Sequence, residues 1–156
     1  MSIKGQIPEN WIEVALQNGY YIGFPEIPEK TENSSNQSLN YKLEQNNLIL
    51  SLNITDLSNE ISFRENKNNI TAYYRAVLED LSKDLKGKIE EQLHFVFDES
   101  IEGLKAQLIA KDEQIYLQFV IIENTLYTAS IIIFEEEDPS ILQLKNNFFY
   151  SFRKKG

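Results

Sequence analysis

The sequence holds almost none of the thiol and imidazole side chains that serve in catalysis and metal binding. It has no cysteine, so disulfides, thiol catalysis and thiolate metal sites are excluded. His94 is the single histidine, so any histidine-dependent reaction must use this side chain. It falls on the half-polar face of an expected strand, which favours a structural or solvated role over a catalytic one. Neither the Gly-x-Ser-x-Gly motif nor a glycine-rich phosphate-binding loop is present.

The densest charge cluster is Glu135-Glu136-Glu137-Asp138. Carboxylate oxygens are the ligands of calcium and magnesium, so one interpretation is a divalent-cation site. The other interpretation is structural, with Asp138 as the N-cap of a helix that begins at Pro139 and the acids near its positive end. Because four successive residues point in different directions, they converge poorly on one ion, and the structural interpretation is favoured.

Two clusters of aromatic residues could contact either a partner protein or the hydrophobic core. Tyr73 and Tyr74 lie early in an expected helix, where at least one must face the sheet, and core packing is favoured. Near the C-terminus, Phe148 and Phe152 share a helix face and Phe149 lies beside it. Tyr150 is displaced from that face, so it either packs on the sheet edge or is exposed.

These residues predict no catalytic, cofactor-binding or metal-binding side chain, and we expect that the protein is not an enzyme. A less favoured alternative is a hydrolase or metal-dependent enzyme in which His94 works with nearby carboxylates. That alternative requires a pocket that encloses His94 and at least two acids within hydrogen-bonding reach.

Composition predicts an acidic globular protein. The 156 residues suit a single domain, which we expect to span 1–156 with its core over about 11–154. A net charge of −9 argues against nucleic acid and anionic membranes as partners. No apolar run approaches the ~20 residues needed to cross a bilayer, so membrane insertion is not expected. The N-terminus lacks a signal-peptide pattern. This predicts a cytoplasmic protein, or a periplasmic or cell-envelope protein whose leader has been removed.

Hydrophobic periodicity predicts the elements that must position these side chains. Strands are expected over 11–16, 20–24, 39–43, 48–57, 89–98, 104–110, 115–122 and 126–134. Asn18-Gly19 predicts a type I′ turn between the first two strands. The polar segment 29–40 is expected to be a mobile loop, and 58–69 a polar connector. Helices are expected over 70–86, with Asn69 as N-cap, and over 139–152.

The last two strands are apolar on both faces. In strand 115–122 the residues of one face are Ile115, Leu117, Phe119 and Ile121, and those of the other are Tyr116, Val120 and Ile122. Such a strand lies in the middle of a sheet that is covered on both sides, and the two helices could supply the covers. Hairpin-length connections then predict an α+β fold in which an antiparallel β-sheet is sandwiched between helices.

Three segments resemble motifs of bacterial PsbP-like proteins. YYIGFPEIP at 20–28 resembles their N-terminal motif, in which a Phe-Pro pair is followed by a second proline. Leu126-Tyr127 resembles part of a family hairpin, and NFFYSFR at 147–153 resembles a closing helix that ends in Phe-x-x-Ser-Phe. Order and spacing agree from about Trp11 to Lys154, although Gly23 stands where a polar residue is usual. The resemblance implies the α/β/α sandwich of the PsbP-like superfamily, which includes DcrB-like proteins and shares its fold with a yeast Ran-binding import factor.

The resemblance implies architecture more than activity, because known members of the superfamily mostly bind other proteins or stabilise assemblies. We therefore expect a non-enzymatic protein-binding or accessory protein without a cofactor. The alternative is an acidic chaperone or immunity-type protein that binds a secreted effector, since a charge of −9 suits a basic partner. We expect the functional surface on polar faces and loops rather than in segment 115–153.

Overall fold

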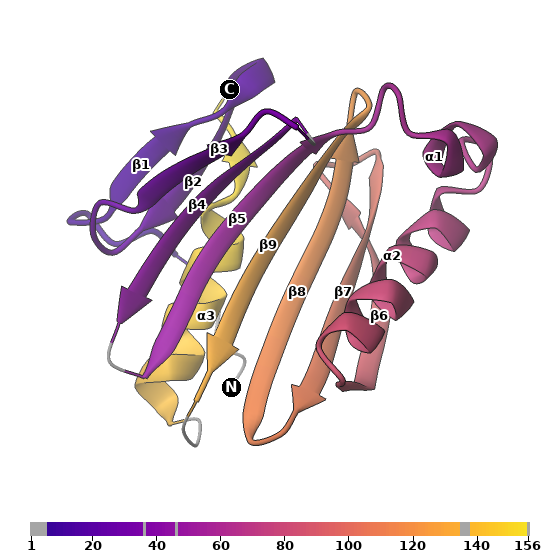
Figure 1. Ribbon diagram of the computed structural model, residues 1–156. Helices are drawn as coiled ribbons and strands as arrows, with labels where there is room; N and C mark the ends of the chain where they lie inside the picture. The colour runs from indigo at the N-terminus through magenta and orange to yellow at the C-terminus, as the bar shows by residue number, and fades with distance from the viewer. Residues whose placement is uncertain (1–5, 36, 46, 135–137, 156) are drawn as a thin grey trace.

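The computed structural model describes residues 6–35, 37–45, 47–134 and 138–155. Its strands are β1 (Ile12–Ala15), β2 (Tyr20–Phe24), β3 (Glu29–Asn33), β4 (Ser38–Gln45), β5 (Leu48–Asp56), β6 (Lys88–Phe97), β7 (Ile101–Ala110), β8 (Glu113–Ile122), β9 (Thr125–Ile133) and β10 (Arg153–Lys154). Its helices are α1 (Ile61–Glu65), α2 (Ile70–Asp84) and α3 (Pro139–Ser151) (Figure 1).

The centre of the molecule is an antiparallel sheet in the order β3-β4-β5-β9-β8-β7-β6. After β5 the chain crosses one face of this sheet through α1 and α2 and begins β6 at the far edge (Figure 1). It then returns strand by strand until β9 pairs with β5. This route places β8 and β9 inside the sheet, as the two-sided apolar pattern predicts.

Each face of the sheet has its own hydrophobic core. Ile115, Leu117 and Phe119 pack in the core beneath α2, together with Tyr74 and Leu78 of that helix. Their neighbours on β8, Val120 and Ile122, pack on the opposite face in the core beneath α3. The predicted division of β8 into two apolar faces is therefore confirmed.

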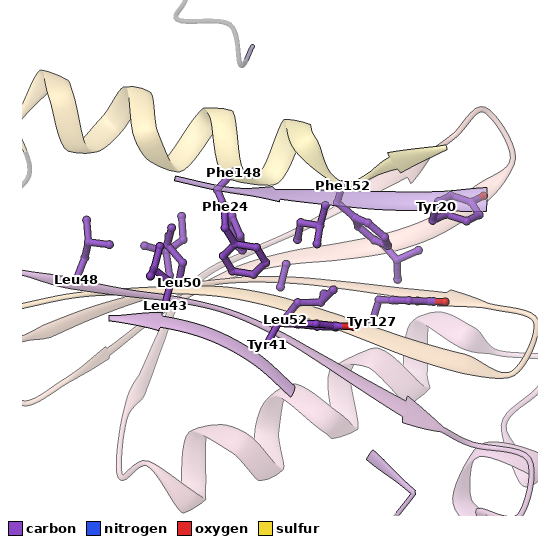
Figure 2. Close-up of a cluster of buried hydrophobic side chains, with 14 of the residues drawn as sticks. Tyr20, Phe24, Tyr41, Leu43, Leu48, Leu50, Leu52, Tyr127, Phe148 and Phe152 are labelled. Carbon is purple, nitrogen blue, oxygen red and sulfur yellow. The ribbon is translucent and has the colours of Figure 1, made fainter. Parts of the chain in front are cut away.

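β1, β2 and β10 form a separate small sheet in the order β1-β2-β10. The turn between β1 and β2 is of type I′, with φ of 62° at Asn18 and 81° at Gly19, and the Tyr20 N–H donates to the Gln17 carbonyl. The hairpin and its turn are as predicted. β2 lies with α3 on one side of the large sheet, and α2 lies on the other (Figures 1 and 2). The predicted α+β sandwich is confirmed, with the small sheet as an additional part of one outer layer.

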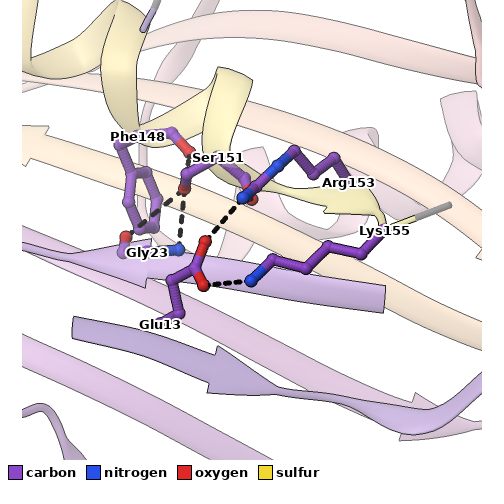
Figure 3. Close-up of polar contacts among 6 residues, drawn as sticks. All are labelled: Glu13, Gly23, Phe148, Ser151, Arg153 and Lys155. Atoms are coloured by element: carbon purple, nitrogen blue, oxygen red, sulfur yellow. Dashed lines mark hydrogen bonds and ion pairs between the residues drawn. The ribbon is translucent and has the colours of Figure 1, made fainter. Parts of the chain in front are cut away.

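The segments that resemble PsbP-like motifs meet in the core beneath α3 (Figure 2). The ring of Phe24 packs edge-on against Phe148 at 5.3 Å between centroids, and Phe152 lies 5.3 Å from Tyr127. The Gly23 N–H donates to Ser151 Oγ at 2.8 Å (Figure 3). A Cβ at Gly23 would lie 3.2 Å from the Ser151 Cβ. Glycine therefore lets β2 approach α3 closely.

The predicted mobile loop over 29–40 is wrong. Glu29–Asn33 forms the edge strand β3, which pairs along its length with β4. All five residues are exposed, so the strand is held by backbone hydrogen bonds and leaves no hydrophobic period in the sequence. The connector at 58–69 likewise contains the short helix α1, which buries Phe63 beside Tyr73. Among the described residues, no helix has the length and apolar character needed to cross a membrane.

Candidate functional site

The side of the large sheet that carries α3 is only partly covered. A groove with a volume of about 720 Å³ lies between the C-terminal half of α3 and strands β6, β7 and β8. The residues that line it come from widely separated parts of the chain, between Phe95 and Lys154. Their position depends on the meander β6-β7-β8 for the floor and on the end of α3 for the wall.

The floor of the groove is built around the ring of Phe95. Phe95 stands opposite Gly103 in the β6–β7 ladder. A Cβ at Gly103 would lie 2.6 Å from the Phe95 ring, so the absence of a side chain allows the ring to lie across β7. Lys105 Nζ lies over the same ring, 4.8 Å from its centroid. At the inner end, Phe97 stacks on Phe152 with 5.0 Å between centroids.

The wall of the groove presents cations and aromatic rings from α3. Lys145 Nζ lies 3.9 Å from the centroid of the Tyr116 ring, which is within the range of a cation–π contact. Phe149 and Tyr150 also line the groove. Tyr150 is 57% exposed, which settles the choice between edge packing and exposure in favour of exposure.

The groove is basic although the chain is acidic. Its lining includes four basic side chains, Lys105, Lys145, Arg153 and Lys154, and one acidic side chain, Asp98. The whole chain carries 15 basic and 24 acidic residues. The Asp98 carboxylate accepts a hydrogen bond from the Tyr20 hydroxyl at 2.9 Å. Burial, together with this carboxylate, raises the pKa of Tyr20 to about 12.

The three lysines in the groove are available for a ligand. Within the described part of the chain, Lys105, Lys145 and Lys154 have no carboxylate at ion-pair distance. Arg153 differs, because its Nη2 lies 2.5 Å from Glu13 Oε1 (Figure 3). Lys155 donates to the other Glu13 oxygen, and these two donors hold the pKa of Glu13 below its usual value. Arg153 and Lys155 thus fasten the end of the chain to β1.

His94 lies away from the groove. It is exposed on β6, and its Nε2 lies 3.1 Å from Nη2 of Arg75 on α2. It lines neither the groove nor a second pocket of about 520 Å³, which lies beside the β1–β2 turn. Among the described residues, no three histidine or carboxylate side chains gather as metal ligands would. Neither of these two pockets therefore encloses His94, as the hydrolase alternative would require.

The helix-cap interpretation of Asp138 is confirmed. Its carboxylate accepts hydrogen bonds from the Ile141 N–H at 2.9 Å and from Ser140 Oγ at 2.6 Å. These bonds lower the pKa of Asp138. Pro139 opens α3 as predicted. The other three acids of the run, Glu135, Glu136 and Glu137, lie outside the described residues.

Tyr73 and Tyr74 both pack in the core, as favoured from the sequence. Tyr73 donates to Glu60 Oε1 at 2.8 Å. The Tyr74 hydroxyl donates to the Glu102 carbonyl and accepts from the Ile121 N–H, each at 2.8 Å. These tyrosines are removed from solvent and join α2 to its surroundings, so neither contributes an exposed anchor for a partner.

Sequence reasoning did not find the groove. It expected the functional surface outside segment 115–153, yet Tyr116, Lys145 and Tyr150 lie in that segment and line the groove. Two signals pointed here: the displacement of Tyr150 from the apolar stripe of its helix, and Gly103 within a strand, where glycine often marks a close approach.

Comparison with known proteins identifies the fold. No family model matches the sequence, and no curated protein sequence matches it. The solution structure of cyanobacterial PsbP from Synechocystis is similar, with a TM-score of 0.65 and 11% identity over 99% of this chain and 98% of that one. A protein of unknown function from Pseudomonas aeruginosa gives a TM-score of 0.45 and 13% identity over 85% of this chain and 86% of that one. The similarity to cyanobacterial PsbP extends over both chains almost completely, and the chain therefore has the PsbP-like fold.

Proposed function

We propose that this chain is a non-enzymatic binding protein that holds a segment of a partner protein in the groove between α3 and strands β6–β8. The observation that carries the proposal is the partly exposed aromatic floor, built around Phe95, beside an exposed aromatic wall. Tyr150 is 57% exposed on the wall, and Leu93, two residues from Phe95 and on the same face of β6, is 58% exposed. Exposed aromatic and aliphatic side chains beside a concave surface are typical of protein-binding sites.

The charged groups of the groove also favour binding over catalysis. Four are cations, and the single carboxylate is engaged by a tyrosine hydroxyl. General acid–base chemistry requires a side chain within reach of the substrate whose pKa suits the transfer of a proton. His94, the residue best suited to that role by type, is on another part of the surface. These features support an accessory, non-enzymatic role.

An acidic chaperone or immunity-type protein that binds a basic effector is the second candidate function. Its support is the net charge of −9, because complementary charge accelerates association. The gene context tests it, since a gene for a basic secreted protein should lie next to the gene for this chain. A housekeeping context without such a neighbour would contradict it.

Affinity capture from cells of the native organism tests the proposed function. The groove variant Leu93→Ser/Tyr150→Ser removes two exposed apolar side chains beside the groove. The control Ile27→Ser/Ile61→Ser removes two others that are 78% and 68% exposed elsewhere. We expect the wild-type chain and the control to recover the same partner and the groove variant to lose it. Recovery of no partner by the wild-type chain, or equal recovery by both variants, would contradict the proposal.

A further inference from the structure

We propose that the segment held in the groove is acidic, an extended stretch in which aspartate or glutamate accompanies an aromatic or large aliphatic side chain. This inference rests on the proposed function and gives the chemistry of the partner. It is opposite to the expectation from net charge, which favours a basic partner. The difference arises because the charge of the groove has the opposite sign to that of the whole chain.

The charge of the groove favours an acidic ligand. Basic side chains outnumber acidic ones four to one in the groove, whereas acids outnumber bases 24 to 15 in the chain. At physiological ionic strength the Debye length is about 8 Å, so acids elsewhere on the surface are largely screened from a ligand in the groove. Charges that touch the ligand therefore decide its sign. Lys105 and Lys145 line the groove, and the one acidic group in the lining, Asp98, already accepts a hydrogen bond from the Tyr20 hydroxyl.

Lys105 and Lys145 contact aromatic rings, and neither is paired with a carboxylate of the described residues. Lys145 Nζ lies 3.9 Å from the Tyr116 ring centroid and Lys105 Nζ lies 4.8 Å from that of Phe95. A cation over a ring at an exposed site is held weakly, whereas a carboxylate forms charge-assisted hydrogen bonds with the ammonium group. Arg153 shows the contrasting arrangement, because Glu13 already occupies its guanidinium. Lys105 and Lys145 can therefore bind carboxylates of a partner without breaking an existing ion pair to a described residue.

The length of the groove suits a short extended segment. The wall runs from Lys145 to Tyr150 on α3, roughly 8 Å at 1.5 Å per residue, and Phe152 and the two residues of β10 extend it. An extended segment of about four or five residues matches this length at roughly 3.3 Å per residue. The aromatic floor provides a surface for an apolar side chain between the carboxylates. A nucleic acid fits less well, because its continuous charge would run from the groove onto the acidic remainder of the surface.

Isothermal titration calorimetry with the full chain tests the inference. The probe is an unlabelled synthetic peptide in which glutamates alternate with phenylalanine and leucine, and its counterpart has lysine in place of every glutamate. We expect the acidic peptide to bind and the basic one not to bind. Lys105→Glu/Lys145→Glu should weaken binding by ~10-fold or more, because two attractive contacts become repulsive.

Lys30→Glu/Lys67→Glu is the matched control. These two lysines also lie over aromatic rings, 6.0 Å from Tyr41 and 5.9 Å from Phe63, but neither lines the groove. The control changes the net charge by the same amount and should leave the affinity within ~2-fold, since distant charges are screened. If the double charge reversal in the groove reduces folding, Lys105→Gln/Lys145→Gln removes the same two charges and should weaken binding in the same direction.

Each other outcome overturns the inference in a distinct way. Tighter binding of the basic peptide, or equal losses in the groove variant and the control, would show that the groove does not select acidic segments. If the acidic peptide fails to bind while capture of the cellular partner still depends on Leu93 and Tyr150, the inference is wrong and the proposed function stands. If a single-stranded oligonucleotide or 2-naphthoate bound more tightly than the acidic peptide, the ligand would be a nucleic acid or a small aromatic anion, and the inference would be wrong.

Discussion

At the scale of single residues, the hydroxyl groups of two buried tyrosines differ in their hydrogen bonding. The Tyr74 hydroxyl donates to the Glu102 carbonyl and accepts from the Ile121 N–H. The Tyr127 hydroxyl is buried and has no hydrogen-bond partner among the described residues. A buried polar group contributes to stability when it is paired and opposes folding when it is not. The two hydroxyls should therefore make opposite contributions to the free energy of unfolding.

Tyr74→Phe should lower the free energy of unfolding by about 1–3 kcal/mol, because it leaves the Ile121 N–H without its partner. Tyr127→Phe should change it by less than about 0.5 kcal/mol or raise it, because no protein hydrogen bond to a described residue is lost. Urea denaturation of both variants measures the two changes. Equal losses in both, or a larger loss for Tyr127→Phe, would contradict this assignment.

Two buried tyrosines, Tyr20 and Tyr74, predict how stability depends on alkaline pH. Burial raises the pKa of Tyr20 and of Tyr74 from 10.0 to about 12. Above pH 10 the unfolded chain loses these protons while the folded chain keeps them, so stability present below pH 10 declines as the pH rises towards 12. Urea denaturation across this range measures the decline. Tyr20→Phe should make it less steep, and an unchanged slope in that variant would show that Tyr20 does not contribute.

At the scale of elements, Ser151 joins the small sheet to α3. Its hydroxyl accepts from the Gly23 N–H and donates to the Phe148 carbonyl, at 2.8 Å and 2.6 Å. The residue is fully buried, so no water replaces these bonds when the hydroxyl is removed. This contact joins two of the segments that resemble PsbP-like motifs.

Ser151→Ala should destabilise the protein by about 1–3 kcal/mol, because the buried Gly23 N–H loses its acceptor. Ser140→Ala is the control on the same helix, since its hydroxyl is exposed and donates only to Asp138. It should cost less than about 0.5 kcal/mol. Thermal or urea unfolding measures the loss of stability in the two variants. An equal loss in Ser140→Ala and Ser151→Ala would contradict the claim that the buried contact is specifically important.

Elements with a strong hydrophobic period were predictable from the sequence. The two faces of β8, the type I′ turn and the caps at Asn69 and Asp138 all follow from local residue patterns. β3 was missed because an exposed edge strand needs only backbone hydrogen bonds. The separation of the β1–β2 hairpin from the large sheet was not predictable, because the alternation of Tyr20, Ile22 and Phe24 shows that one face is buried without showing what buries it.

The candidate site was less predictable than the fold for a related reason. The groove is the part of a sheet face that α3 leaves uncovered, so it depends on where a helix of limited length is placed. Lys105 and Lys145 are 40 positions apart, and nothing local in the sequence connects them. Phe95 and Gly103 give a partial signal, but only the β6–β7 register shows that they face each other.

At the scale of the whole molecule, opposite charges are separated. The chain carries −9 overall, while the lining of the groove is basic. Net charge keeps an acidic protein soluble and influences long-range association, but a ligand in contact responds to the charges within a few ångströms. The PsbP-like fold contributes the scaffold, a sheet with helices on both faces. The groove in which we place binding is the part of one face that α3 leaves uncovered.

The most direct test of the account is site-specific photo-crosslinking in cells of the native organism. Benzoylphenylalanine would replace Tyr150, which is 57% exposed on the groove, or Ile61, which is 68% exposed on α1. We predict a discrete crosslinked protein from position 150 and none from position 61. A crosslink from position 61 with none from position 150 would contradict the claim that the groove is the partner-binding surface.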